Sequence, residues 1–187
     1  MTTQNEAGVT TRSVWQLDPA HTLVEFSGKH MMFTTVKGHF KGVRGTIVLD
    51  ETDPSRSSVE VEIDAASLYS GVEYRDNHLK SADFLDVEKY PVITFKSTRV
   101  ELVGSDRARI VGGLTIHGVT REVVLDTELT GRGKSPFGKE TVGFEARTSI
   151  NRKDFGLTWN MALETGGWLV GDTIKIEIAL EAHEQPS

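Results

Sequence analysis

Residues 107–130 (RARIVGGLTIHGVTREVVLDTELT) constrain the fold of this chain more than any other stretch. Apolar side chains alternate with more mixed ones on both sides of His117 and Gly118, and a period of two is typical of strands with one apolar face. A two-residue loop needs positive φ, which glycine adopts at little cost. The sequence therefore predicts a tight hairpin in which Ile116 lies opposite Val119.

The rest of the chain should supply neighbours for this hairpin, because an isolated hairpin is only marginally stable. Six further segments have strand-like patterns: residues 23–29, 39–50, 58–64, 92–102, 140–151 and 173–183. Eight strands joined mostly by short antiparallel connections favour an all-β, closed up-and-down barrel, which leaves no free edge. A two-sheet sandwich is the alternative architecture.

Residues 65–91 interrupt this pattern, because they show no period-two alternation. We expect a short helical insertion that lies across one end of the sheet. Within it, residues 75–79 are expected to form one helix, and Ser81 is a candidate N-cap for a second. That second helix would hold Phe84 and Leu85.

The remaining segments are predicted to be connections or tails. Residues 15–18 are expected to lead into the first strand, residues 30–38 to form a turn or a single helical turn, and residues 131–139 a flexible connection. Residues 1–13 are polar and are expected to form a flexible tail. Residues 14–183 then form a single domain, which suits a chain of 187 residues.

Charge and composition exclude several function classes. The net charge is −6 and the lysines and arginines are scattered, so no nucleic-acid groove is expected. The chain has no cysteine, which excludes disulfides, thiol catalysis and cysteine-ligated metals. No apolar run reaches transmembrane length and no signal peptide is visible. A cytoplasmic location is therefore expected, or a periplasmic or secreted one if a leader has been removed.

Five separated motifs carry a resemblance to a known family. They are WQLDPAHTLVEFSGKHM (15–31), RDNHLKSADFLDVEKYPVITF (75–95), GLTIHGVT (113–120), GFEARTSINRKDFGLTW (143–159) and VGDTIKIEIALEA (170–182). In this order they resemble the YceI-like family of polyisoprenoid-binding proteins, over nearly the whole chain. The resemblance implies a lipocalin-like antiparallel barrel whose lumen holds a long isoprenoid chain, often in a homodimer.

The inward-facing apolar side chains either line such a lumen or fill a solid core, and the resemblance favours a lumen. Strands rising ~3.3 Å per residue at a tilt of ~40° predict a barrel roughly 30 Å tall, which suits an elongated apolar molecule. The expected lumen residues are Phe26, Phe40, Val43, Ile47, Phe95, Ile110, Leu114, Val123, Leu125, Phe144 and Ile176.

Methionines, large aromatic side chains and one leucine also occur outside the predicted strands. They are Met31, Met32, Phe33, Phe84, Leu85, Met161 and Trp168. Adaptable methionines beside aromatic rings suit a mouth that admits a flexible chain. The alternative is that these side chains plug the ends of the barrel.

The family pattern also marks charged residues beside these loops. They are Asp18, His21, Arg75, Asp76, His78, Arg152 and Asp154. They are expected to form an ion-pair network that fixes the loops, or to contact a ligand head group. An Asp–His pair raises a catalytic hypothesis as well. No serine lies in a nucleophile elbow and no third partner is identifiable, so no catalytic residue is assigned.

The sequence predicts a binding protein for a long apolar isoprenoid, such as a polyprenyl chain or an isoprenoid quinone, held in the lumen for carriage or storage. The six histidines are scattered without metal-ligand spacing, so neither a metal site nor a required cofactor is expected. One alternative function is an enzyme that acts on a lipid-like substrate. Another is a dry barrel, filled by its own side chains, that works through protein partners.

Overall fold

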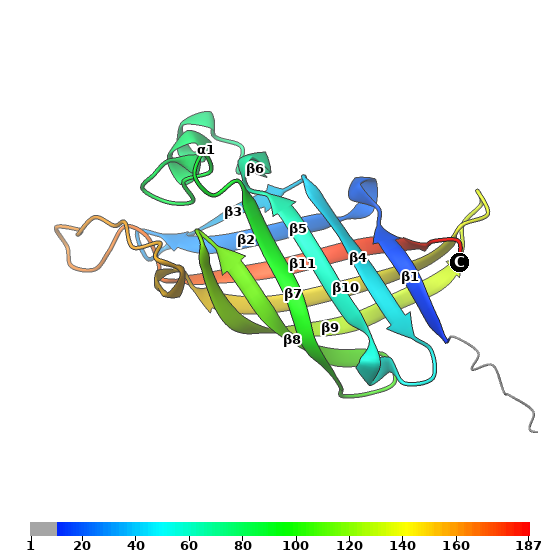
Figure 1. Ribbon diagram of the computed structural model, residues 1–187. Coiled ribbons are helices and arrows are strands. Elements are labelled where there is room, and N and C mark those ends of the chain that lie inside the picture. Colours follow the sequence, from blue (N-terminus) through cyan, green and yellow to red (C-terminus); the bar gives the residue numbers. More distant parts are fainter. Residues whose placement is uncertain (1–10) are drawn as a thin grey trace, which may run out of the picture.

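The computed structural model describes residues 11–187, and its strands close into an antiparallel barrel (Figure 1). Around the wall, in this order, run β1 (Arg12–Leu17), β4 (Val43–Asp50), β5 (Ser58–Asp64), β7 (Val92–Leu102), β8 (Arg107–Ile116), β9 (Val119–Lys134), β10 (Glu140–Asn151) and β11 (Thr173–Glu184). The closure is made by β11, which pairs with β1. The predicted all-β, eight-stranded antiparallel barrel is therefore confirmed.

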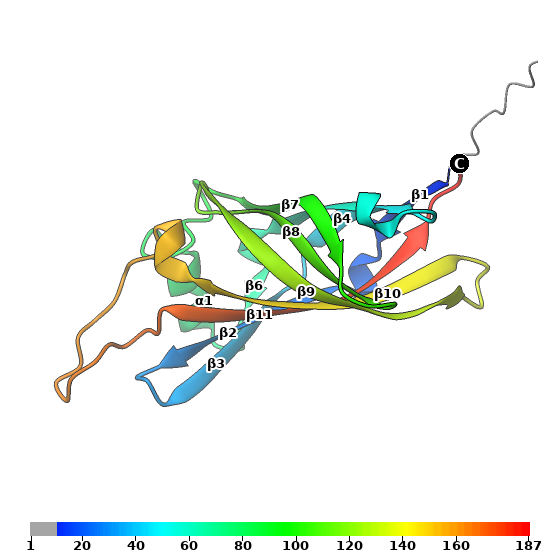
Figure 2. The same ribbon diagram turned by 90° about the horizontal axis from the view of Figure 1, so that it is seen from below.

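Three more strands extend this sheet beside β11: β2 (Leu23–His30), β3 (Thr34–Phe40) and β6 (Leu68–Tyr69). The short 3₁₀ turn η1 (Pro19–His21) separates strand β1 from strand β2. As a result, β11 pairs with β1 near its C-terminal end and with β2 further back. The β2–β3 hairpin projects at the same end of the barrel as the long loop that precedes β11 (Figure 2).

Three expectations for this region were wrong. The single strand expected at residues 39–50 is divided, because β3 ends at Phe40 and β4 begins at Val43. The expected lead-in at residues 15–18 belongs mostly to β1, and the expected turn at residues 30–38 contains most of β3. The turn itself is confined to the hairpin tip, where Met31 and Met32 have positive φ values of 52° and 67°. Pairing with β2 orders β3 through its backbone, although its exposed N-terminal half has no apolar alternation that would predict a strand.

The β8–β9 hairpin has the predicted register, with Ile116 opposite Val119 and a two-residue turn at positive φ. However, β9 continues to Lys134, so the first four residues of the predicted flexible connection at residues 131–139 are strand. In these four residues two glycines alternate with Arg132 and Lys134, so no apolar face predicts a strand, and backbone pairing with β10 holds them. The chain reverses only between Ser135 and Lys139, whose backbone groups are hydrogen-bonded at 2.7 Å.

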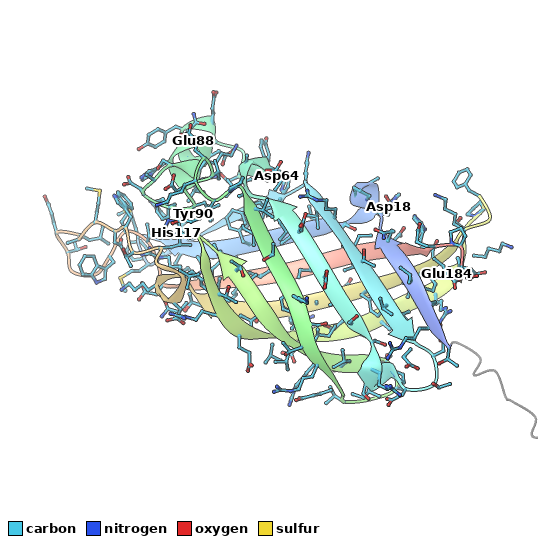
Figure 3. The ribbon with its side chains drawn as sticks, viewed as in Figure 1. Asp18, Asp64, Glu88, Tyr90, His117 and Glu184 are labelled. Carbon is cyan, nitrogen blue, oxygen red and sulfur yellow. The ribbon has the colours of Figure 1, made fainter. Side chains whose placement is uncertain are left out.

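The insertion at residues 65–91 contains the 3₁₀ turn η3 (Ala65–Ser67), β6 and one helix, α1 (Glu73–Lys80). Ser81 ends α1 instead of capping a second helix, because its N–H and hydroxyl both donate to the carbonyl of His78. Residues 82–85 form turns. The insertion is anchored on the β8–β9 turn, where the Tyr90 and His117 rings lie 4.7 Å apart (Figure 3).

The remaining short elements are η2 (Pro54–Arg56), between β4 and β5, and η4 (Arg152–Phe155), after β10. Of the predicted tail at residues 1–13, residues 1–10 lie outside the described residues. The last two residues of the predicted tail belong to β1, which begins at Arg12. Between residues 11 and 187, no helix is long and apolar enough to cross a membrane.

Candidate functional site

The barrel encloses a cavity of about 580 Å³. Its wall consists mainly of side chains from alternate positions of the barrel strands, which a strand necessarily directs to one face. On β10, for example, Val142, Phe144, Ala146, Thr148 and Ile150 all line it. The period-two pattern of the sequence is therefore the direct cause of an apolar interior.

Every residue predicted for the lumen lies in this wall. The set comprises Phe26, Phe40, Val43, Ile47, Phe95, Ile110, Leu114, Val123, Leu125, Phe144 and Ile176. Their contact with a ligand stays a prediction. The wall also includes other apolar side chains that alternate on the predicted strands: Val24, Leu49, Val59, Val61, Ile63, Ile178 and Leu180. Leu17, from the segment that was expected to be a lead-in, lines the wall as well.

Two aromatic side chains in the wall face glycines on the neighbouring strand. Phe26 pairs with Gly38, and a Cβ added to Gly38 would lie 2.4 Å from the Phe26 ring. A Cβ added to Gly112 would likewise lie 2.6 Å from the ring of Phe95. Because no side chain occupies these positions, both rings lie close against the wall, and space remains in the middle of the barrel.

The two ends of the cavity differ in chemistry. At the insertion end, Leu79, Phe84 and Leu85 line it. At the opposite end, where the turns after β4 and β7 lie, the lining is polar and charged: Asp50, Glu51, Ser57, Ser58, Ser105, Asp106, Arg107 and Arg132. This charged rim, as we call it from here on, includes an ion pair in which an Arg132 nitrogen lies 3.0 Å from a Glu51 oxygen.

Among the predicted mouth residues, Phe84 and Leu85 reach the wall, and the Phe84 side chain is buried. The others lie on the surface of the β2–β3 tip and of the loop before β11: Met31, Met32, Phe33, Met161 and Trp168. The two segments are adjacent, since the Met31 N–H donates to the carbonyl of Leu169. These five exposed residues thus lie at one end of the barrel without lining the cavity.

Arg152 is the most deeply buried of the charged residues that line the cavity, with 2% of its side chain exposed. Its guanidinium donates to the carbonyls of Leu157, Trp159, Val170 and Gly171 at 2.6–3.3 Å. Burial lowers the pKa of this guanidinium, while the charge of Asp172 raises it. Arg152 therefore holds the loop before β11, and its acidic neighbour is Asp172 rather than the exposed Asp154.

The charged residues of the insertion bind one another and its backbone. Asp76 accepts hydrogen bonds from the N–H and hydroxyl of Ser70, and Arg75 donates to the hydroxyl and carbonyl of the same serine. His78 Nε2 lies 2.9 Å from Asp83 Oδ2. None of these five residues lines the cavity, and their hydrogen bonds hold the insertion together.

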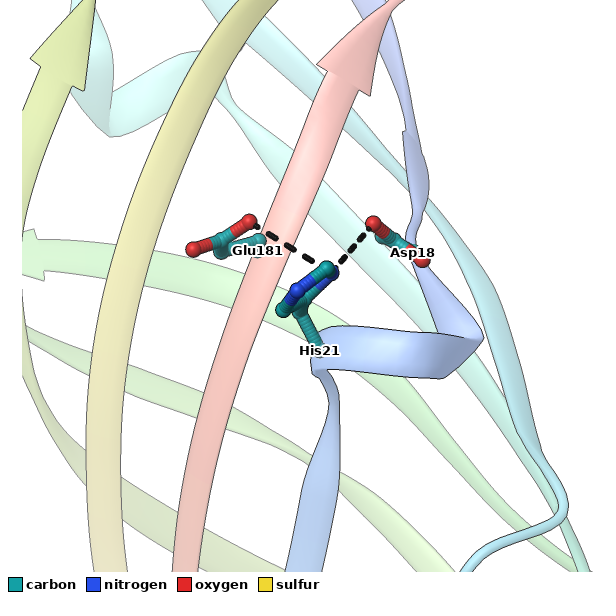
Figure 4. A group of neighbouring side chains, drawn as sticks. All are labelled: Asp18, His21 and Glu181. Carbon is teal, nitrogen blue, oxygen red and sulfur yellow. Dashed lines mark hydrogen bonds and ion pairs between the residues drawn. The ribbon is translucent and has the colours of Figure 1, made fainter. Parts of the chain in front are cut away.

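Asp18 and His21 lie at the 3₁₀ turn between β1 and β2, away from the insertion and outside the cavity wall (Figures 3 and 4). Asp18 Oδ2 is 2.8 Å from His21 Nδ1 and 3.0 Å from His183 Nε2. These two hydrogen bonds lower the pKa of Asp18 to about 2. The hydrogen bond to Asp18, followed by the charge of Glu181, raises the pKa of His21. The predicted polar residues thus form separate local groups instead of one network.

Comparison with known proteins gives one family. Residues 15–182 match the YceI-like domain. A UPF0312 protein of Pseudomonas putida is 37% identical over 165 residues, which cover 88% of this chain and 82% of that protein. The crystal structure of the Campylobacter jejuni YCEI protein is 34% identical, with a TM-score of 0.71 over 84% of this chain and 90% of that one.

A more distant solved structure shares the fold alone. It is a polyisoprenoid binding domain from Saccharophagus degradans implicated in plant cell wall breakdown. Its sequence is 15% identical, and the TM-score is 0.66 over 91% of this chain and 98% of that one.

Proposed function

The chain belongs to the YceI-like domain family, and from this premise we propose that its cavity binds one long apolar isoprenoid, such as a polyprenyl chain or an isoprenoid quinone, for carriage or storage. The observation that carries the proposal is the cavity of about 580 Å³ with apolar walls between its two ends. The related fold of a polyisoprenoid binding domain supports the ligand class by analogy.

The volume of the cavity is that of a ligand-binding pocket, whereas a core filled by its own side chains would leave no such space. Ligand pockets generally measure about 300–1,000 Å³, whereas an engineered apolar cavity of ~150 Å³ already binds benzene. A space of about 580 Å³ lies within the first range. An apolar space of this kind is poorly solvated, so filling it with hydrocarbon is favourable.

The driving force would be desolvation of the chain. Each buried methylene contributes about 0.8 kcal/mol, so about twenty carbons gain ~16 kcal/mol before ordering costs are subtracted. Tight binding therefore needs no dedicated polar contact. Selectivity among lipids would follow from the length and width of the cavity.

A polar head group would lie at the charged rim. Burying a hydroxyl or carbonyl without a partner costs roughly 1–3 kcal/mol, so the head group should stay near water or hydrogen-bonding groups. The rim offers Arg107 and Arg132 together with carboxylates. At the opposite end, the guanidinium of Arg152 already donates to four backbone carbonyls, so it is less available to a head group than Arg107 and Arg132 are.

The test compares lipid uptake by two delipidated variants. One carries a new arginine on the lumen face of β10, and the other carries it on the outer face. Phe144 lines the cavity, whereas its neighbour Glu145 is exposed. We expect Phe144→Arg to abolish uptake of a polyprenol or a quinone, because the guanidinium would lie among apolar side chains. Glu145→Arg introduces the same side chain on the outer face and should leave uptake unchanged.

A third variant covers the case in which Phe144→Arg does not fold. Ala146→Phe adds an apolar ring at a cavity-facing position of β10. It should reduce the amount of lipid bound, while the circular dichroism spectrum stays that of a β-protein. Normal uptake by folded Phe144→Arg and Ala146→Phe would contradict the assignment of the binding site to the lumen.

A further inference from the structure

A cluster of carboxylate and imidazole side chains lies on the outside of the barrel, where β11 changes its pairing partner from β1 to β2. Asp18 and His21 come from the two ends of the tight segment around η1. Glu181 and His183 lie two residues apart on β11 and so face the same side of the strand. Figure 4 shows the His21 ring between the two carboxylates of Asp18 and Glu181.

The ligand atoms of three of these side chains lie close to one another. His21 Nδ1 is 2.8 Å from Asp18 Oδ2 and 3.9 Å from Glu181 Oε2, and the three ligand atoms lie within 4.8 Å of one another. Zinc binds imidazole nitrogen and carboxylate oxygen at about 2.0–2.2 Å, so ligand atoms around a tetrahedral ion lie about 3.4 Å apart. Small side-chain rotations would bring the three atoms to this spacing.

We propose that Asp18, His21 and Glu181 form a binding site for a divalent transition-metal ion of the zinc type. The donor set is one imidazole and two carboxylates, a mixture that favours Zn²⁺ over the all-oxygen sites of Ca²⁺ and Mg²⁺. Three protein ligands leave the fourth tetrahedral position to water.

The surroundings orient these ligands. Asp18 Oδ1 accepts the N–H of Ala20 at 2.9 Å, which directs Oδ2 toward His21. His183 Nε2 contacts the same Oδ2, and its other ring nitrogen lies 3.0 Å from the hydroxyl of Thr141. Hydrogen bonds of this kind around metal ligands fix their orientation and strengthen binding. His183 is therefore a positioning residue.

The electrostatic environment also favours a cation. Asp18 and Glu181 carry two negative charges beside one exposed imidazole. A divalent ion would neutralise both carboxylates and join η1 to β11, so it should stabilise the fold by binding the native state.

The test uses untagged protein stripped of metal with a chelator and then titrated with Zn²⁺ alone by calorimetry. We expect one ion per chain and a rise in melting temperature with zinc concentration. Co²⁺ serves as a spectroscopic probe, since tetrahedral coordination gives visible absorption bands that the free aqueous ion shows only weakly.

Matched variants distinguish this site from other surface groups. His21→Ala and Glu181→Gln should each weaken zinc binding at least tenfold and remove the zinc-dependent rise in melting temperature. His30→Ala, at an exposed histidine on the end of β2, and Glu177→Gln, at an exposed glutamate on the same strand as Glu181, should bind zinc as the unchanged chain does.

Two results would overturn the proposal: no saturable binding by the unchanged protein, or undiminished binding by folded His21→Ala. Melting curves recorded without metal establish that each variant is folded. The site lies outside the cavity wall, so lipid uptake by these variants should be normal, and the outcome is independent of the proposed lipid binding.

Discussion

At the scale of single residues, glycines in the wall help to decide whether the barrel is open or filled. Gly38 has no side chain where the Phe26 ring lies, and Gly112 has none where the Phe95 ring lies. Each ring occupies the space above its glycine and not the middle of the lumen. Apolar alternation alone predicts the same inward residues for a filled core and for an open lumen.

We expect Gly38→Ala to reduce the lipid capacity of the protein. The new Cβ would lie 2.4 Å from the Phe26 ring, which must then rotate toward the lumen, at a cost of about 1 kcal/mol of stability for the tighter packing. Bound lipid per chain after incubation with a polyprenol measures the effect. Gly131→Ala is the control, because a Cβ there meets no atom within 4 Å; equal capacity in both variants would refute the role of Gly38.

Asp50 makes the stability of the fold depend on pH at acid values. Its carboxylate accepts the N–H groups of Asp53 and Thr52 and the Thr52 hydroxyl. These bonds, with the one from Asp53 the largest cause, lower the pKa of Asp50 from 3.8 to about 2. A lowered native pKa means that the ionised carboxylate stabilises the fold above about pH 4, and that this contribution is lost as the pH falls toward 2.

Urea unfolding of the unchanged protein and of Asp50→Asn should therefore converge at acid pH. The variant cannot ionise, so its deficit in free energy of unfolding should be full near pH 6 and should shrink between about pH 4 and pH 2. A deficit that stays constant over this range would show that the charge of Asp50 is not what stabilises the turn after β4.

At the scale of elements, the β8–β9 turn links the hairpin to the helical insertion. Gly118 has a φ of 72°, and a Cβ added to it would lie 2.7 Å from the Tyr90 ring. Gly118→Ala should therefore cost about 1–2 kcal/mol for the left-handed backbone, plus a further loss from the displaced Tyr90. Gly138→Ala, at a φ of 81° with no atom within 4 Å of the added Cβ, isolates the backbone part. Chemical denaturation of both variants gives the two values, and equal losses would mean that Tyr90 moves freely.

The elements that the sequence predicts well are those with a buried face. Apolar alternation located β5, β7, β8, β10 and β11, and Gly118 fixed the register of the central hairpin. The strands that were missed are β1, β3, β6 and the end of β9. β1 has only two buried side chains, Trp15 and Leu17, and β6 has two residues, so neither shows a clear alternation. β3 and the end of β9 are ordered largely by backbone pairing with a neighbour. Backbone pairing does not depend on side-chain polarity, so it leaves little trace in the sequence.

At the scale of the whole molecule, closure of the barrel brings distant side chains together in ways that no local pattern predicts. The sequence analysis identified Asp18 and His21 but not Glu181 and His183, because the contact between them forms only when β11 closes on β1. By contrast, the predicted lumen residues follow from strand alternation, and all of them line one cavity. The charged rim was also missed, since the turns that form it meet only in the closed barrel.

The most direct test of the account is organic extraction of the natively purified protein, followed by mass spectrometry of the extract. We predict about one apolar lipid per chain, with the masses of a polyprenyl chain or an isoprenoid quinone that differ by whole five-carbon units. An extract without such a lipid, from a protein that also takes up no polyprenol or quinone on incubation, would contradict the proposal that the cavity is a lipid-binding site.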